Sequence, residues 1–432
     1  MSPITTDHVP PFTAGIALDG AGWHPAAWRE PGARPDALFT AAYWQSLITD
    51  AEAAGADYVT IDDSLRLPAA GVTNDEVPPR PKAHLVEGRL DALLIASWVA
   101  PHTGRIGLIP TVTTTHTEPF HVATALQTLD HISLGRAGWQ LRFSVSDAEA
   151  AAFGRRAAPA VDVSAVLTGQ PDAGLAELIG DAADVAEVAR RLWDSWERDA
   201  IIRDVASGRF LDGDRLHHID FDSERFSAIG PSIVPTSPQG QLPITLLAHS
   251  PHIFGLAART ADVVFITPAN DQRAAGASRG KGAQELVAEV RAAEALEDRQ
   301  PSGLAPLRIV ADVVVAVDTA EESAAERLHR LDDLAGARFA SDALVAAGSP
   351  EEIVDLIASW HAEGVEGVRL RPLTNATDLA AIGTSVVPLL RDRIPSSAAA
   401  DASQLRDRFG LEASTNRYTA ERETAQRKEH VA

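Results

Sequence analysis

Residues 105–144 read RIGLIPTVTTTHTEPFHVATALQTLDHISLGRAGWQLRFS, the pattern of a strand, a loop, a helix and a second strand. The apolar strand expected over 106–109 leads into threonines and a histidine that no hydrophobic core requires. Thr117, Glu118 and Pro119 suit a helix start, with Thr117 as the expected cap. Apolar residues then recur at helical spacing as far as Ile132. The unit predicts a parallel α/β fold with polar residues at the strand exits.

The same alternation of apolar runs and helical patterns extends along the chain. Eight strands are expected, over 13–18, 58–61, 106–109, 138–141, 244–247, 263–266, 309–317 and 367–370. Further helices are expected over 41–54, 91–99, 185–205, 284–296, 320–335 and 351–362. Ser349 and Glu352 have the spacing of a capping box. A closed (β/α)₈ TIM barrel is the simplest interpretation, and a doubly wound sheet is the alternative.

The length suits a single barrel domain with insertions. We expect this domain over residues 12–395, after an extension over 1–11 and before a C-terminal arm or tail, 396–432, that lies outside the barrel. Three connections exceed an ordinary βα unit: 142–183, 207–242 and 268–283. We expect all three to form insertions over the mouth of the barrel, where the strands end.

The composition limits the classes of partner. The formal net charge of −22 argues against nucleic acid and against an anionic membrane surface, both of which attract basic patches. The absence of cysteine excludes disulfides, thiolate metal sites and a cysteine nucleophile. No His-Glu-x-x-His pattern occurs, so no metal site is expected. No secretory or membrane-spanning segment is visible, which predicts a cytoplasmic protein that acts on small molecules.

Polar residues follow the predicted strands, and barrels of this class keep their active sites there. The candidates are Asp62, Asp63, Thr111, Thr113, Gln140, Arg142, Ala248, His249, Ser250, Thr267, Arg369 and Arg371. His116 and His249 are the candidate catalytic side chains among the strand exits. Arg369 and Arg371 lie on one face of the last strand, so they require either carboxylate partners or a bound anion. Both possibilities stay open.

Several stretches of sequence resemble the luciferase-like flavin monooxygenases, in the branch of the nitrilotriacetate and dibenzothiophene-sulfone monooxygenases. Within the opening stretch they are the Arg-Ile-Gly-Leu strand, Pro119-Phe120-His121, and Leu129-Asp130-His131 followed by 135–139. Elsewhere they are GWHPAAWR at 22–29, LWDSW at 192–196, PQG at 238–240 and AARTADVVF at 257–265. The resemblance as a whole is taken to cover residues from about 12 to 395.

The resemblance implies a barrel of the bacterial luciferase type that uses reduced FMN and O₂ to oxygenate a small organic substrate. The FMN would come from a separate NAD(P)H:flavin reductase, and a flavin C4a-(hydro)peroxide would carry the chemistry. A homodimer or homotetramer is usual in this family. Two alternatives remain: an F420-dependent oxidoreductase, and a flavin-binding or partner subunit without catalysis.

The resemblance also implies roles for particular residues. Cofactor contacts are expected from Asp63, Thr111, Thr113, Gln140, Arg142, Ala248, His249 and Ser250. Substrate contacts are expected from Trp23, His24, Trp28, Arg369 and Arg371. The chain departs from the family where Gln140 replaces asparagine, and where Ala248-His249-Ser250-Pro251 replaces Gly-Ser-Ser-Pro. The Cβ of Ala248 can block a close approach of the backbone to a phosphate.

Overall fold

The computed structural model describes residues 11–67, 82–162, 170–269, 280–297, 304–394 and 402–420, together with Val166, Arg299 and Arg422. Eight parallel strands form a closed barrel because β10 pairs with β11 and β1 pairs with β13. They are β1 (Thr13–Leu18), β2 (Tyr58–Ile61), β3 (Gly107–Thr113), β4 (Trp139–Arg142), β9 (Ile244–Leu247), β10 (Val263–Ile266), β11 (Arg308–Val317) and β13 (Gly367–Pro372). The predicted barrel is confirmed, and the doubly wound alternative is wrong.

A further parallel strand, β12 (Leu344–Gly348), was not predicted. It pairs with the last five residues of β11, above the part of β11 that pairs with β10. Because β12 lies beside the C-terminal half of β11, the loop before β12 reaches the mouth of the barrel.

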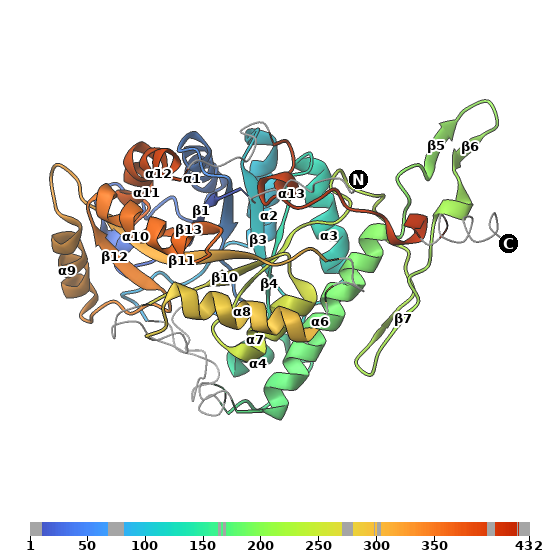
Figure 1. The fold of residues 1–432 in the computed structure, drawn as a ribbon, viewed down its shortest axis with the longest axis horizontal. Helices are drawn as coiled ribbons and strands as arrows, with labels where there is room; N and C mark the ends of the chain where they lie inside the picture. Colours follow the sequence, from blue (N-terminus) through green and yellow to red (C-terminus); the bar gives the residue numbers. More distant parts are fainter. Residues whose placement is uncertain are drawn as a thin grey trace, which may run out of the picture.

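Helices cover the outside of the barrel (Figure 1). They are α1 (Ala41–Ala53), α2 (Ala92–Val99), α3 (Pro119–Ile132), α6 (Ala173–Asp194), α7 (Pro251–Thr260), α8 (Ala283–Glu297), α9 (Ala324–Ala335), α10 (Pro350–Ala362), α11 (Asp378–Ala381) and α12 (Val387–Arg393). Short 3₁₀ turns lie at Ala27–Arg29, Ala100–His102 and Gly213–Arg215, and a π-helical turn lies at Ile382–Val386.

Two expectations about helix ends differ from the structure, and one is confirmed. The helix expected over 185–205 begins twelve residues earlier and ends at Asp194. Glu118, not Thr117, is the N-cap of α3, because the Thr117 hydroxyl donates instead to the carbonyls of Thr113 and Thr114. The capping box that Ser349 begins is present at the start of α10.

The three long connections do not all lie at the mouth. The described part of 142–183 follows β4 and includes α4 (Asp147–Phe153), so it leaves the barrel at the end where the strands finish, and an insertion over the mouth stays a prediction. The expectation for 207–242 is wrong, because this segment follows helix α6 and precedes strand β9, and connections from helix to strand emerge at the opposite end of a barrel. Figure 1 shows the small strands between α6 and β9 projecting beyond the C-terminal end of α6. Most of 268–283 lies outside the described residues.

These small strands form two antiparallel pairs. β5 (Ile201–Asp204) pairs with β6 (Arg209–Leu211), and β7 (Phe221–Asp222) pairs with β8 (Ser227–Ala228).

The C-terminal arm closes the floor of the barrel. Leu405 of α13 (Leu405–Arg408) and Phe409 are almost fully buried in one cluster with Tyr58, Ile109 and Phe265. A Cβ on Gly107 would lie 2.5 Å from a Leu405 methyl, so β3 must begin with a glycine for Leu405 to pack against it. The expectation that the arm lies outside the barrel is therefore wrong for residues 405–409. The apolar side chains of the arm fill the space beside the glycines of the barrel strands.

Alternation along the strands explains why the floor is apolar and the mouth polar. Tyr58 and Ile109 point inward at the floor, so Thr60 and Thr111, two residues further on, point inward at the next level. The same parity directs Gln140, Arg369 and Asp312 into the barrel. The upper half of the barrel interior is thus lined by polar side chains on most strands.

Candidate functional site

A cavity of about 540 Å³ opens at the mouth of the barrel. This volume lies within the range of about 300–1,000 Å³ that is usual for small-molecule sites. Seven of the predicted candidate residues line it: Trp23, Asp62, Gln140, Arg142, His249, Arg369 and Arg371. Leu246, Leu247 and Ile253 supply an apolar wall. The structure therefore brings together residues from β4, β9 and β13 that are distant in sequence.

Arg369 and Arg371 are paired with carboxylates. Asp312 of β11 accepts hydrogen bonds from both guanidinium groups, and all three side chains are at most 2% exposed. Asp342, in the loop before β12, accepts a second bond from Arg371 at 2.6 Å. Of the two possibilities that the sequence left open, carboxylate pairing is the one observed. Their role toward a substrate stays a prediction.

The pairing fixes the side chain of Gln140. Its Oε1 accepts from Arg369 Nη1 at 2.6 Å, so its amide NH₂ group remains for a ligand. The Gln140 side chain thus extends toward Arg369 of β13.

Both ring nitrogens of His249 have partners within the protein. Nδ1 lies 3.1 Å from Thr267 Oγ1, and Nε2 lies 3.3 Å from Asp342 Oδ2. The Arg371 guanidinium holds the pKa of Asp342 well below its ordinary value, although burial opposes it, so the carboxylate is charged. An imidazole held in this way orients the site but presents no free nitrogen for proton transfer.

Asp62, not Asp63, faces the cavity. The inward parity of Tyr58 and Thr60 continues to Asp62, which pairs with Arg89 at 2.8 Å and lies 3.9 Å from Arg142. Asp63 points outward and accepts the backbone N–H groups of Ser64 and Ala92, the first residue of α2. Asp63, expected beside the cofactor, thus serves as a cap, while its carbonyl accepts from Arg142 at 2.6 Å.

The pKa of Asp63 predicts a pH dependence of stability. Burial raises it to about 6, although the Ala92 N–H opposes the shift. The folded protein therefore binds this proton more tightly than the unfolded chain, and the contribution of Asp63 to the free energy of unfolding falls as pH rises from about 4 to about 6. We expect Asp63→Asn to reduce this decline in urea unfolding measured across the range. Parallel curves for the two proteins would contradict the assignment.

Two buried hydroxyl groups near the cavity have no hydrogen-bond partner. Thr111 is in parallel register with Gln140, and its Oγ1 is buried and unpaired. Ser250, the N-cap residue of α7, also has a buried and unpaired Oγ. Unpaired buried polar groups are costly, and they are typical of sites that a ligand completes. Both positions were predicted as cofactor contacts.

The remaining predicted contacts have different surroundings. Thr113 is buried at the end of β3. Ala248 is fully buried, and its N–H donates to the carbonyl of Phe265, so it does not line the cavity. His116 is buried against Phe153, with both ring nitrogens unpaired and φ at 71°. Burial lowers the pKa of His116. Of the two candidate catalytic histidines, His116 has free ring nitrogens, but it does not line the cavity.

The tryptophan-rich loop after β1 lines a second, smaller cavity of about 200 Å³. Trp23, His24 and Trp28 all contribute to it, and Trp23 also borders the larger cavity. His24 is buried, and its Nδ1 accepts the N–H of Ala26 while Nε2 faces Asp332 of α9 at 3.2 Å. Burial lowers the pKa of His24, although Asp332 opposes the shift. Because Nδ1 accepts a hydrogen bond, the ring is neutral, and it anchors α9 to the loop.

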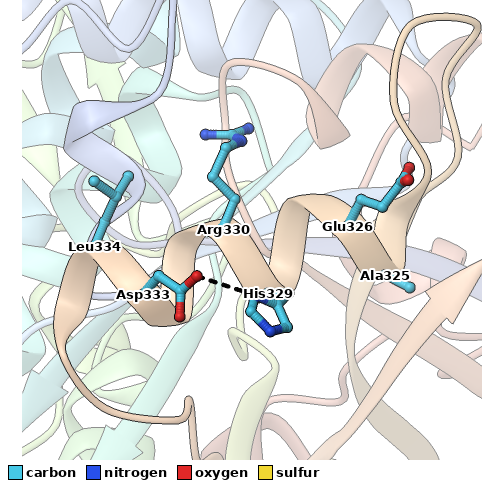
Figure 2. A pocket seen from close by; sticks show the side chains of 6 residues that line it. All are labelled: Ala325, Glu326, His329, Arg330, Asp333 and Leu334. Carbon is cyan, nitrogen blue, oxygen red and sulfur yellow. Dashed lines mark ion pairs between the residues drawn. The ribbon is translucent and has the colours of Figure 1, made fainter.

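A surface hollow of about 590 Å³ lies along α9, lined by residues of that helix alone (Figure 2). Its His329 and Asp333 form an ion pair, and both side chains are more than 70% exposed. We do not assign chemistry to this hollow, since it is open and one helix supplies its whole lining. Within the described ranges, no three His, Asp or Glu side chains cluster so as to hold a metal ion.

Comparison with known proteins identifies the family. The model of the luciferase-like monooxygenases matches residues 21–333. The chain belongs to the luciferase-like monooxygenase family. It is accordingly an oxygen-incorporating oxidoreductase, and the predicted resemblance is confirmed.

Two relatives and one structure show how far the likeness to this luciferase-like family extends. An N-acetyl-S-(2-succino)cysteine monooxygenase from Bacillus subtilis is 27% identical over 94% of this chain and 97% of its own. Nitrilotriacetate monooxygenase component A from Aminobacter aminovorans is 34% identical over 58% of this chain and 52% of its own. The crystal structure of a long-chain alkane monooxygenase superposes with a TM-score of 0.75, at 19% identity, over 93% of this chain and 95% of that one.

Sequence reasoning missed several residues in and around this candidate site. Asp312 interrupts the apolar run of β11, and that single charge was a signal for an inward-facing partner of the arginines. Asp342 and Arg89 lie in loops, where no periodicity indicates direction. Among the described helices, none is long and apolar enough to cross a membrane.

Proposed function

We propose that this flavin-dependent monooxygenase uses reduced FMN, delivered by a separate NAD(P)H:flavin reductase, to oxygenate a small organic substrate at the barrel mouth. The observation that carries the proposal is the pair of unpaired buried hydroxyls, Thr111 and Ser250, close to the cavity of about 540 Å³. The cavity combines an apolar wall with polar groups. This combination suits the isoalloxazine ring of a flavin, which has an apolar dimethylbenzene end and a polar pyrimidine end. These residues fit the cofactor.

The residues have distinct tasks in this proposal. Thr111 and the Gln140 amide would donate hydrogen bonds to the ring system, and Ser250 would bind the phosphate at the start of α7, where the helix dipole favours an anion. Leu246, Leu247 and Ile253 exclude water from one wall of the cavity. When bound, the reduced flavin supplies the electrons that activate O₂.

Oxygen-dependent turnover tests the proposal. The purified protein is supplied with reduced FMN by a generic flavin reductase, and binding of reduced FMN is measured anaerobically. We expect reduced FMN to bind in the micromolar range or tighter. Absence of binding contradicts the proposal, and hydride transfer from reduced F420 without oxygen would replace it with the deazaflavin alternative.

The variant Thr111→Val tests whether the Thr111 hydroxyl contacts the cofactor or only supports the fold. Because the Thr111 hydroxyl has no partner in the protein, an isosteric valine should leave stability unchanged or raise it. Loss of one hydrogen bond of about 0.5–1.5 kcal/mol should weaken reduced FMN binding by about 2- to 12-fold. Thr124→Val, which removes a hydroxyl bonded within α3, is the control and should leave FMN binding unchanged. Equal FMN affinity in Thr111→Val and the wild type would exclude the contact.

A further inference from the structure

We propose that the cavity of about 200 Å³ beside the cofactor cavity binds an uncharged, ring-sized apolar group of the substrate and disfavours carboxylates. This assignment rests on the proposed function only in placing the flavin in the larger cavity. Trp23 and Asp62 line both cavities, so a group bound in the smaller one lies next to the larger one.

Three indole rings line the small cavity, and each of their N–H groups already donates to a backbone carbonyl. Trp23 donates its indole N–H to the carbonyl of Ala17 at 2.8 Å. Trp28 and Trp44 donate theirs to the carbonyls of His84 and Leu38, at 3.3 and 3.1 Å. These three side chains therefore offer apolar ring surface and no free donor. Further apolar surface comes from Pro25, Leu38, Phe39, Leu85, Val86 and Leu90.

The volume sets the size of the group. An apolar cavity of about 150 Å³ in another protein is large enough to bind benzene. At about 200 Å³, this cavity accommodates one six-membered ring with a short substituent, or a branched aliphatic group of similar size. The rest of a larger substrate would extend past Trp23 toward the larger cavity.

The charges that line the small cavity oppose an anion. Arg89 is the one cation among the described lining residues, and it is shared by Asp19 at 3.5 Å and Asp62 at 2.8 Å. His24 is neutral, because its Nδ1 accepts a backbone hydrogen bond. Two carboxylates face one guanidinium, so a third carboxylate brought by a ligand would be repelled.

The larger cavity also lacks a spare cation for a polycarboxylate. Asp312 and Asp342 neutralise Arg369 and Arg371. Arg142 lies 3.9 Å from Asp62 and donates to the Asp63 carbonyl. Among the described residues that line either cavity, every guanidinium thus has a carboxylate within 4 Å. We therefore infer a substrate class different from that in the name of the nitrilotriacetate relative.

Binding of two probes of equal size tests the inference. Benzyl alcohol and benzoate are titrated into the full-length protein by calorimetry near neutral pH, with and without reduced FMN under anaerobic conditions. We expect benzyl alcohol to bind in both conditions and benzoate to bind at least tenfold more weakly. Val86→Phe, which fills the cavity, should weaken benzyl alcohol by about tenfold or more. Trp98→Ala removes a half-exposed ring on α2 outside both cavities and should leave this affinity unchanged.

Three results would overturn the inference: benzoate binding as tightly as benzyl alcohol, no effect of Val86→Phe, or displacement of benzyl alcohol by FMN. If Val86→Phe fails to fold, Phe39→Ala replaces it, because Phe39 is 51% exposed and its loss spares the core. Phe39→Ala should then weaken benzyl alcohol severalfold, and an unchanged affinity overturns the inference. Failure of FMN to bind refutes the proposed function alone and leaves the probe results valid.

Discussion

Asp312→Asn should destabilise the protein by about 3–5 kcal/mol, the usual cost of removing one partner from a buried ion pair. Asp312 is fully buried and accepts from both Arg369 and Arg371. The amide removes the negative charge and leaves Arg369 without a charged partner in the barrel interior. Urea unfolding near neutral pH measures the loss, and a change below about 1 kcal/mol would show that water or repacking compensates.

An exposed aspartate provides the matched control for this prediction. Asp355 pairs with Arg393 at 2.5 Å, and the two side chains are 63% and 60% exposed. Asp355→Asn removes the same charge from an ion pair in water. We expect a change within about 0.5 kcal/mol, because exposed ion pairs contribute little. The contrast between the two variants therefore measures the effect of burial.

Phe409→Ala should cost about 3–5 kcal/mol, the range for large-to-small changes of buried aromatic residues. The Phe409 ring is 1% exposed, and its centroid lies 5.0 Å from that of Tyr58 at the barrel floor. The variant opens a cavity between the C-terminal arm and the strands. Thermal and urea unfolding measure the loss, and an unchanged stability would show that the arm does not close the barrel.

Two further variants make this prediction specific. Phe409→Leu keeps most of the apolar volume and should cost less than the alanine variant. Phe210→Ala removes a ring that is 61% exposed on β6, and its effect should stay within about 0.5 kcal/mol. Since the floor lies at the opposite end of the barrel from the mouth, reduced FMN binding should persist in the folded fraction of Phe409→Ala.

Periodicity in the sequence was sufficient to predict the barrel. The eight strands were located within a few residues because each is a short apolar run bounded by polar residues. Segment 207–242 was predicted at the wrong end of the barrel. The length of a connection indicates an insertion, but the end of the barrel at which the insertion lies depends on whether a helix or a strand precedes it. The arm was assigned outside the barrel because two apolar residues in a polar tail give no periodic signal.

The sequence predicted many of the residues at the candidate site, but not how their side chains pair or which of them face the cavity. The alternation around Arg369 and Arg371 correctly placed both side chains on one face, yet it could not identify Asp312 as their partner. Asp62 and Asp63 are adjacent in the sequence, and only the parity of β2 in the barrel decides that Asp62 faces the cavity. The cap formed by Asp63 depends on Ala92, which lies 29 residues away.

Apolar periodicity and strand-end chemistry are local properties of a chain, so they were enough to predict a parallel barrel with polar strand exits, and the resemblance of particular stretches indicated the luciferase-like family. Which polar side chains neutralise one another, and which face a cavity, became known only from the tertiary structure. Ion pairing and burial depend on distances between strands that are remote in sequence. Those distances leave Thr111 and Ser250 unpaired, and they surround the small cavity with indole rings and carboxylates.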